Sequence, residues 1–128
     1  GVPAQREGVI DAPIARLGTG AKRAVRPDGR RAVTHYRVEQ AAGGRALIRL
    51  RLETGRTHQI RVHLAHIGCL SSADSLYARQ LPEVQDALAL HSAHLRCVQP
   101  VTGKTVEVVE PLPEELKALL TPSVCLLT

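Results

Sequence analysis

The chain has 128 residues, a net charge of +5 and a hydrophobic share of 44%, which together indicate one globular domain rather than a disordered tail. It contains no Phe, Trp or Met and only two Tyr, so its core must be built from Leu, Val, Ile and Ala, or be completed by material outside this chain. No apolar run approaches the ~20 residues that span a bilayer, and no signal-peptide pattern is present.

Residues 1–31 are predicted to be irregular, because proline and glycine recur too often there for a long helix or strand. The chain opens on Gly1 rather than Met, which is compatible with the removal of an N-terminal part. This region also holds a basic stretch, formed by Lys22, Arg23, Arg26, Arg30 and Arg31. Such a stretch is either a solvated loop or a set of phosphate contacts without base specificity.

Two strands are predicted next, at residues 33–38 and 46–53, and Gly43 and Gly44 mark the turn of a hairpin between them. The second strand has the clearer pattern. Its apolar residues alternate with charged ones, which indicates one buried and one wet face. Tyr36 is interpreted as a core or sheet residue.

A helix is predicted over residues 57–67, with Thr57 as its N-cap and Gly68 as its C-terminal stop. Its apolar stripe at helical spacing consists of Ile60, Leu64 and Ile67. Residues 69–89 are predicted to be a loop with one weak helical turn. Two more strands are expected at 93–98 and 104–110, with His91 and His94 as strand residues, and a short last helix begins at Pro113.

The chemistry is concentrated around the start of the predicted helix. Residues 54–68 contain two Arg, three His and one Gln, which is more polar than a purely structural helix requires. A helix N-terminus with polar side chains forms an anion-facing corner. Arg56 and Arg61 can each offer a planar fork to a carboxylate or phosphate.

The charge distribution agrees with a polyanionic partner. Residues 1–66 contain 13 Arg or Lys and 5 Asp or Glu, a net charge of +8, whereas residues 67–128 contain 4 and 7, a net charge of −3. A basic half gains affinity for a polyanion by releasing its counterions. A merely soluble, arginine-rich surface is the alternative, and composition alone leaves both open.

Residues 54–63, TGRTHQIRVH, resemble the signature of the RluA-type pseudouridine synthases. Further segments resemble that family in the same order along the chain: residues 8–14, 32–38, 74–77, 90–92, 100–103 and 111–113. The resemblance therefore covers nearly the whole chain. It implies an α+β fold, with a mixed, mostly antiparallel sheet and packed helices, of which residues 1–128 are the C-terminal portion of the catalytic domain.

The resemblance further implies cofactor-free isomerisation of uridine in rRNA or tRNA. In such enzymes an aspartate initiates cleavage of the base–ribose bond, and the freed uracil turns and rejoins through C5. Arg61 matches the arginine that pairs with this aspartate, and Leu90 matches a position on the wall of the base pocket. Arg56 and His58, with the basic stretch, are assigned to RNA contacts or to support of the site.

The chain departs from the family at the aspartate itself. The expected segment, H-R-L-D-x-x-T-S-G, is absent, and Asp11, Asp28, Asp74 and Asp86 lie in other contexts. Two hypotheses follow. Either an active synthase carries the aspartate on an N-terminal half that is missing here, or the protein is an inactive RNA-binding or ribosome-assembly protein that retains the synthase fold. The chain by itself is expected to be inactive.

Other kinds of site find little support in the sequence. His63 and His66 lie three residues apart, but no Cys or carboxylate completes a zinc-binding set, so no metal is expected. Three cysteines at unrelated spacings indicate reduced thiols in an intracellular protein, cytoplasmic or mitochondrial, and no membrane partner is expected. The sequence does not indicate the oligomeric state.

Overall fold

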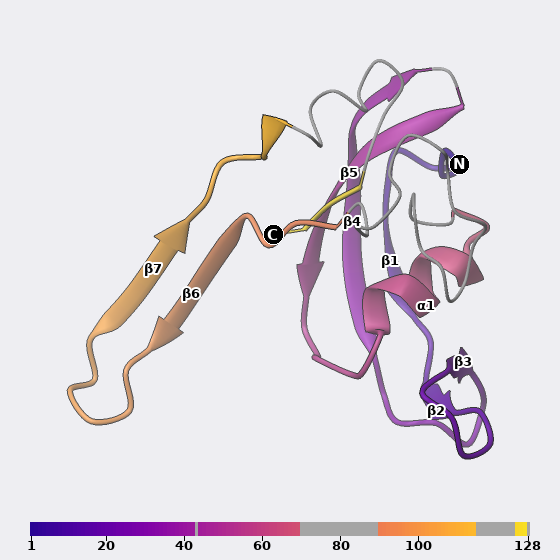
Figure 1. Cartoon of the computed structure of the whole chain (residues 1–128), viewed down its shortest axis with the longest axis horizontal. Coiled ribbons are helices and arrows are strands. Elements are labelled where there is room, and N and C mark those ends of the chain that lie inside the picture. The colour runs from indigo at the N-terminus through magenta and orange to yellow at the C-terminus, as the bar shows by residue number, and fades with distance from the viewer. Residues whose placement is uncertain (43, 70–89, 115–124, 128) are drawn as a thin grey trace.

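The computed structural model describes residues 1–42, 44–69, 90–114 and 125–127, and its elements are shown in Figure 1. They are β1 (Glu7–Asp11), β2 (Ile14–Arg16), β3 (Arg23–Val25), β4 (Val33–Ala42), β5 (Arg45–Leu52), α1 (Gln59–His66), β6 (His94–Val98), β7 (Thr105–Val109) and β8 (Cys125–Leu127).

The main sheet has four strands in the order β1-β4-β5-β8. β4 pairs antiparallel with both β1 and β5, and β5 pairs parallel with the short β8. The predicted hairpin is therefore confirmed, as is a mixed and mostly antiparallel sheet. The register shifts between Val38 and Gln40, where β4 has a bulge.

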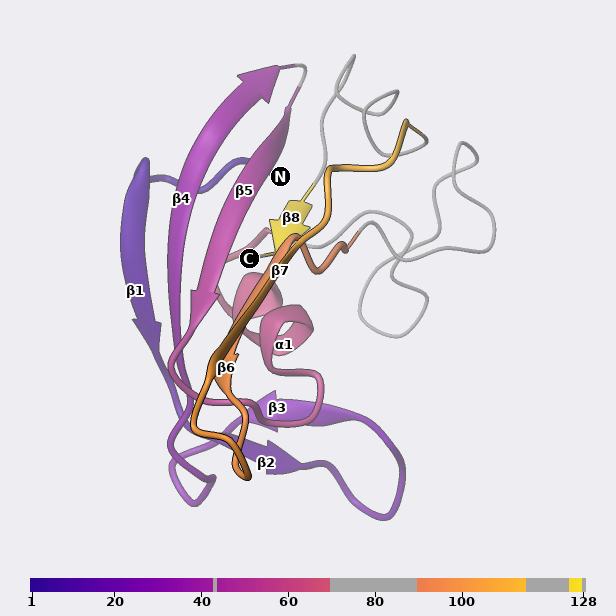
Figure 2. The same ribbon diagram turned by 90° about the vertical axis from the view of Figure 1, so that its left-hand side faces the viewer.

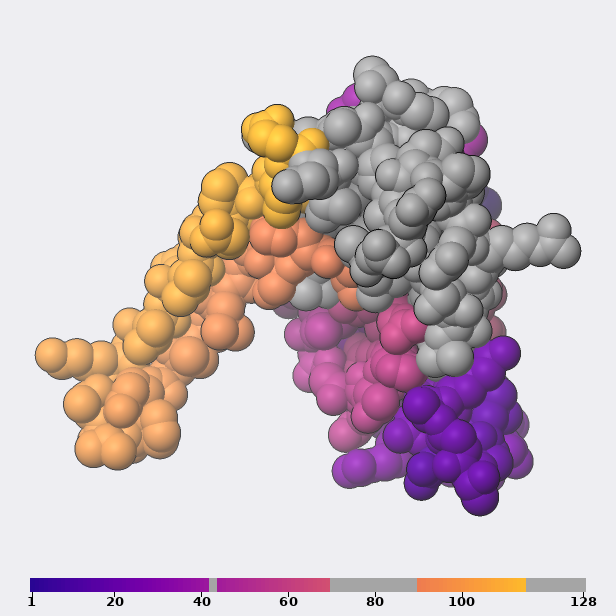
Figure 3. Space-filling model, viewed as in Figure 1, coloured from indigo at the N-terminus to yellow at the C-terminus, as the bar shows by residue number. Residues whose placement is uncertain are grey.

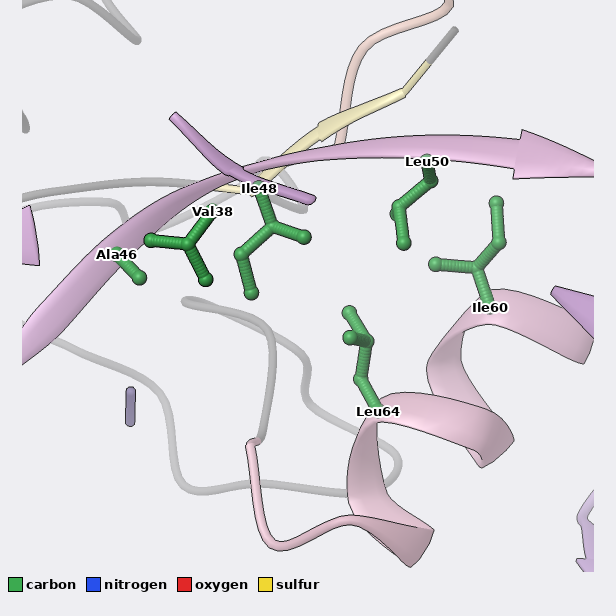
Figure 4. Close-up of a cluster of buried hydrophobic side chains, with 6 residues drawn as sticks. All are labelled: Val38, Ala46, Ile48, Leu50, Ile60 and Leu64. Atoms are coloured by element: carbon green, nitrogen blue, oxygen red, sulfur yellow. The ribbon is translucent and has the colours of Figure 1, made fainter. Parts of the chain in front are cut away.

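The larger of the two core clusters in the described part of the chain lies between this sheet and α1 (Figure 4). Alternate residues of β5, Ala46, Ile48 and Leu50, are buried, while Arg49 and Arg51 face solvent. This is the alternation that the sequence predicted. From α1, Ile60 and Leu64 point toward these strand residues, and Val38 completes the cluster. Half-buried Tyr36, Ile67 and Leu90 pack against it, which confirms Tyr36 as a sheet residue beside the core.

The prediction of an irregular N-terminal region is wrong. Residues 1–31 contain three strands: β1, which extends the main sheet, and β2 and β3, which pair with each other. These strands are only three to five residues long, so they fit between the prolines and glycines that suggested a loop. Ile14 illustrates the stabilisation, since its backbone exchanges hydrogen bonds of 2.9 Å with that of Arg30 across a bridge.

The β2–β3 hairpin packs beside α1 (Figures 1 and 2). A second core cluster joins Ile14 and Ala32 to Val62 of α1, with half-buried Val25 of β3 against it. Helix α1 is thus held on one side by the main sheet and on another by this hairpin.

β6 and β7 form a separate two-stranded ribbon, which confirms the predicted pair of strands. The ribbon extends away from the rest of the molecule in Figures 1 and 3. Its turn is closed by Gln99, whose side-chain oxygen accepts hydrogen bonds from the backbone N–H groups of Val101 and Thr102. His94 lies in β6, whereas His91 precedes the strand, so the prediction for His91 is wrong.

Several predictions lie outside the described residues: nearly all of the loop at 69–89, including the family-like residues 74–77, and the last helix beyond Glu114. Within the part of the chain that the structure describes, no helix is long and apolar enough to cross a membrane.

Candidate functional site

Helix α1 begins and ends in well-defined turns. Its N-cap is His58, in the left-handed region with φ 56° and no side-chain capping bond, so the prediction of Thr57 as the cap is wrong. At the other end Gly68 has φ 79°, and the N–H groups of Gly68 and Cys69 bond to the carbonyls of Ala65 and Leu64. This Schellman turn confirms the glycine stop.

A buried glutamine fixes the segment before α1. The amide nitrogen of Gln59 donates to the Val33 carbonyl and the Thr34 hydroxyl, both at 3.0 Å. Its oxygen accepts from the Thr54 hydroxyl at 2.7 Å and from the Arg56 backbone N–H at 3.0 Å. Gln59 therefore uses both ends of its side chain to tie the segment to β4.

His63 extends this network to Ala12, the residue that follows β1. Its Nε2 lies 2.9 Å from the Ala12 carbonyl, which can only accept, so Nε2 carries the proton. Nδ1 then accepts from the Thr34 hydroxyl at 2.8 Å. Burial, as the largest cause, lowers the pKa of His63 below its usual 6.5, and the Ala12 carbonyl opposes this effect. His63 is thus a neutral structural residue.

The arginines predicted to act in the site flank this network. Arg61 is half-buried on α1, and the Arg56 Nε donates to the Arg31 carbonyl at 2.8 Å. Leu90 packs on the core cluster that includes Ile60 and Leu64, so it lies beside the same helix as Arg61. Sequence reasoning took Gln59 and His63 as part of an anion-facing corner, whereas both point into the protein.

Three of the predicted RNA-binding arginines, Arg23, Arg30 and Arg56, line one pocket of about 400 Å³ between the β2–β3 hairpin and the segment 55–57. The pocket also includes Arg16, which the sequence analysis missed. Arg16 could have been found from its position opposite Arg23 in the β2–β3 hairpin, but this hairpin was not predicted from the sequence. Lys22, Arg26 and Arg31 are exposed and do not line the pocket.

No cluster of three or more potential metal ligands occurs among the described residues. His63 has both ring nitrogens in hydrogen bonds, and His66 is exposed. Cys69 and Cys97 are free thiols, and burial raises the pKa of Cys69. Cys69 thus stays protonated near neutral pH.

The family model for RNA pseudouridylate synthase matches residues 2–66, which include β1 to β5 and all of α1. The chain belongs to this family. The resemblance seen in the sequence is thereby confirmed. The match ends at the last residue of α1, so the whole segment 54–63 with Arg61 lies inside it.

Curated relatives agree with membership of the synthase family. The chain is 42% identical to "Uncharacterized RNA pseudouridine synthase YjbO" of Bacillus subtilis, over 91% of the chain and 41% of the relative. It is also 42% identical to "Ribosomal large subunit pseudouridine synthase D" of Xanthomonas campestris, over 88% of the chain and 38% of the relative. The chain thus spans well under half the length of these relatives.

A solved structure shares the synthase fold. Human RNA pseudouridylate synthase domain containing 1 superposes with a TM-score of 0.69 and 25% identity, over 88% of this chain and 51% of the human one. An α+β synthase-like domain, present here in part, is therefore the fold class. Helix packing on the sheet is seen for α1 within the described residues.

Proposed function

We propose that residues 1–128 are the C-terminal portion of the catalytic domain of an RNA pseudouridine synthase, which isomerises uridine to pseudouridine in structured rRNA or tRNA. The observation that carries this proposal is the family-like segment 54–63, held on α1 by the buried Gln59 network. A helix fixed on two sides can hold an arginine in one place, as an active site requires.

Arg61 has the central role in this proposal. Its guanidinium pairs with the catalytic aspartate, which the N-terminal half of the same domain supplies, because a carboxylate in a partly dry site stays ionised most easily beside a fixed guanidinium. Leu90 forms part of the wall of the base pocket. RNA is contacted by Arg56, His58, Lys22, Arg23, Arg26, Arg30 and Arg31. The reaction needs no cofactor, and we place it inside the cell.

A second candidate function is RNA binding without catalysis, in ribosome assembly for example. The sequence leaves this alternative open, because residues 1–128 do not include the segment in which the family carries its aspartate. The sequence immediately upstream of Gly1 in the parent gene separates the two. An H-R-L-D segment there supports the enzyme, and a replaced aspartate supports the inactive protein.

The functional test is tritium release from RNA labelled at C5 of uridine, because isomerisation exchanges that hydrogen. The parent protein, shown to be folded, is incubated with candidate rRNA and tRNA transcripts. Release is expected with at least one of them, and its absence with all of them refutes the enzyme. Arg61→Ala should abolish tritium release and leave much of the RNA affinity intact. Arg49→Ala, on the opposite face of the sheet, is the control and should keep both.

A further inference from the structure

The arginine pocket is defined by Arg16, Arg23, Arg30 and Arg56, and backbone carbonyls hold two of these four side chains. The Arg16 guanidinium donates to the carbonyls of Gly20 and Thr19 at 3.0 and 2.9 Å, and the Arg56 Nε donates to the Arg31 carbonyl. A guanidinium has five N–H donors, so these bonds orient both groups and leave donor capacity for an anion. These carbonyls are neutral, so they do not cancel the positive charge of Arg16 and Arg56.

The one acidic residue that lines the pocket is engaged with an arginine outside it. Asp28 lies 3.1 Å from the Nε of Arg26, which is outside the pocket. The arginines on the open face of the sheet provide the contrast. There Arg49 lies 2.7 Å from Glu39, and Arg37 lies 3.6 Å from Glu7. A phosphate approaching that face meets carboxylates as well as guanidinium groups.

The buried Gln59 network holds one wall of the pocket, at Arg56, in place before any ligand binds. The backbone N–H of Arg56 donates to Gln59, and Gln59 is bonded in turn to Thr34 and Thr54. Gly29, on the opposite wall, lies so close to the Ile14 backbone that a Cβ atom there would come within 2.6 Å of it. Both walls of the pocket are therefore set by tight contacts, which lowers the ordering cost of binding.

We propose that the arginine pocket binds a single phosphate group of the RNA backbone, with Arg16, Arg30 and Arg56 as its ligands and Gln59 as the positioning residue for Arg56. This inference rests on the proposed function, since it takes RNA as the partner. It is narrower than the proposed function. It adds Arg16 to the RNA contacts and excludes Lys22, Arg26 and Arg31 from this phosphate site. A guanidinium fork matches the geometry of two phosphate oxygens better than an ammonium group does.

The test measures binding of the 128-residue chain to a fluorescent RNA hairpin with a uridine-containing loop, at several salt concentrations. Arg16→Gln and Arg56→Gln should each weaken binding by about tenfold or more, and neither should lower the salt slope by more than about 0.7–0.9, the contribution of one phosphate. The double variant should lower the slope no further, because both residues contact the same phosphate. Arg49→Gln, the matched control, should change neither quantity appreciably.

Gln59 is tested through a readout that a general loss of stability does not change. Circular dichroism first establishes the folded fraction, and affinity is compared for folded protein only. Gln59→Leu should reproduce the reduced salt slope of Arg56→Gln. Gln59→Glu retains an acceptor for the Arg56 N–H and should recover part of the affinity, and it carries the test if the leucine variant does not fold.

Four results overturn the proposal. The first is a loss with Arg49→Gln equal to that of the pocket variants, the second is additive slopes in the double variant, and the third is no RNA binding by the folded wild-type chain. Uridine monophosphate binding as tightly as the hairpin would make a free nucleotide the ligand and also overturn it. Tritium release by the parent protein is independent of these outcomes, so the proposed function can stand when this proposal fails.

Discussion

Replacing Thr34 by valine tests the buried network that underlies the site. Thr34 is fully buried, and its hydroxyl donates to His63 Nδ1 at 2.8 Å while accepting from Gln59 Nε2 at 3.0 Å. Valine has nearly the same shape but no hydroxyl. It therefore leaves an imidazole nitrogen and one amide N–H buried without partners.

The expected cost follows from those two orphaned groups. Each buried group without a partner costs about 1–3 kcal/mol, so Thr34→Val should lower the free energy of unfolding by about 2–4 kcal/mol once partial relaxation is allowed. Thr34→Ser keeps the hydroxyl and removes one methyl group, which costs about 1 kcal/mol. The polar substitution should thus be the milder one, although its shape fits the site less well.

Urea unfolding followed by far-ultraviolet circular dichroism measures both variants, because the chain contains no tryptophan. The wild-type chain and the two variants should unfold with similar slopes against urea, so that differences in midpoint report stability. A valine variant as stable as the serine variant would refute the reasoning. It would mean that the hydroxyl contributes little beyond the packing of its methyl group.

Further predictions concern the same region. Burial lowers the pKa of His63 in the folded chain, so neutral His63 stabilises the fold fully above the unfolded pKa near 6.5. This stabilisation is lost as the pH falls from there to the folded pKa. The urea midpoint should therefore be lower at pH 5.5 than at pH 7.5, and His63→Gln should reduce that difference in midpoint. Gly29→Ala places a Cβ against the Ile14 backbone and should lower the free energy of unfolding by about 1–3 kcal/mol or more. Gly55→Ala is the control, because no atom lies within 4 Å of its Cβ, and it should melt near the wild-type temperature. Equal melting curves for the two variants would contradict the close approach at Gly29. His58→Asn should be tolerated at φ 56°, and His58→Val should cost about 1–2 kcal/mol in the same unfolding assay.

The elements that could be predicted are those whose own residues carry the pattern. β5 alternates apolar and charged side chains, and Gly68 stops α1 by its own conformational freedom. β2 and β3 could not be predicted in this way, because each has only three residues and depends on distant partners. The backbone bridge between Ile14 and Arg30 and the packing of Ile14 on Val62 are both non-local.

The candidate site was likewise predictable only in part. Its location was predictable from the density of arginine and histidine in residues 54–68, but the direction of each side chain was not. Gln59 and His63 lie on α1 with Arg61, yet they point inward because β4 offers the Val33 carbonyl and the Thr34 hydroxyl as partners. A single sequence does not indicate which polar residues on a helix will find such partners.

The β6–β7 ribbon bears on the proposed missing half of the domain. Its register places Leu95 opposite Val108 and Cys97 opposite Val106, so these four residues share one face. All of them are exposed, with Leu95 at 58% and Val108 at 51%, and no other described element packs extensively on the ribbon. An isolated two-stranded ribbon is marginally stable at best in water. Its exposed apolar face is therefore a candidate surface for the N-terminal half of the domain that the proposed function invokes.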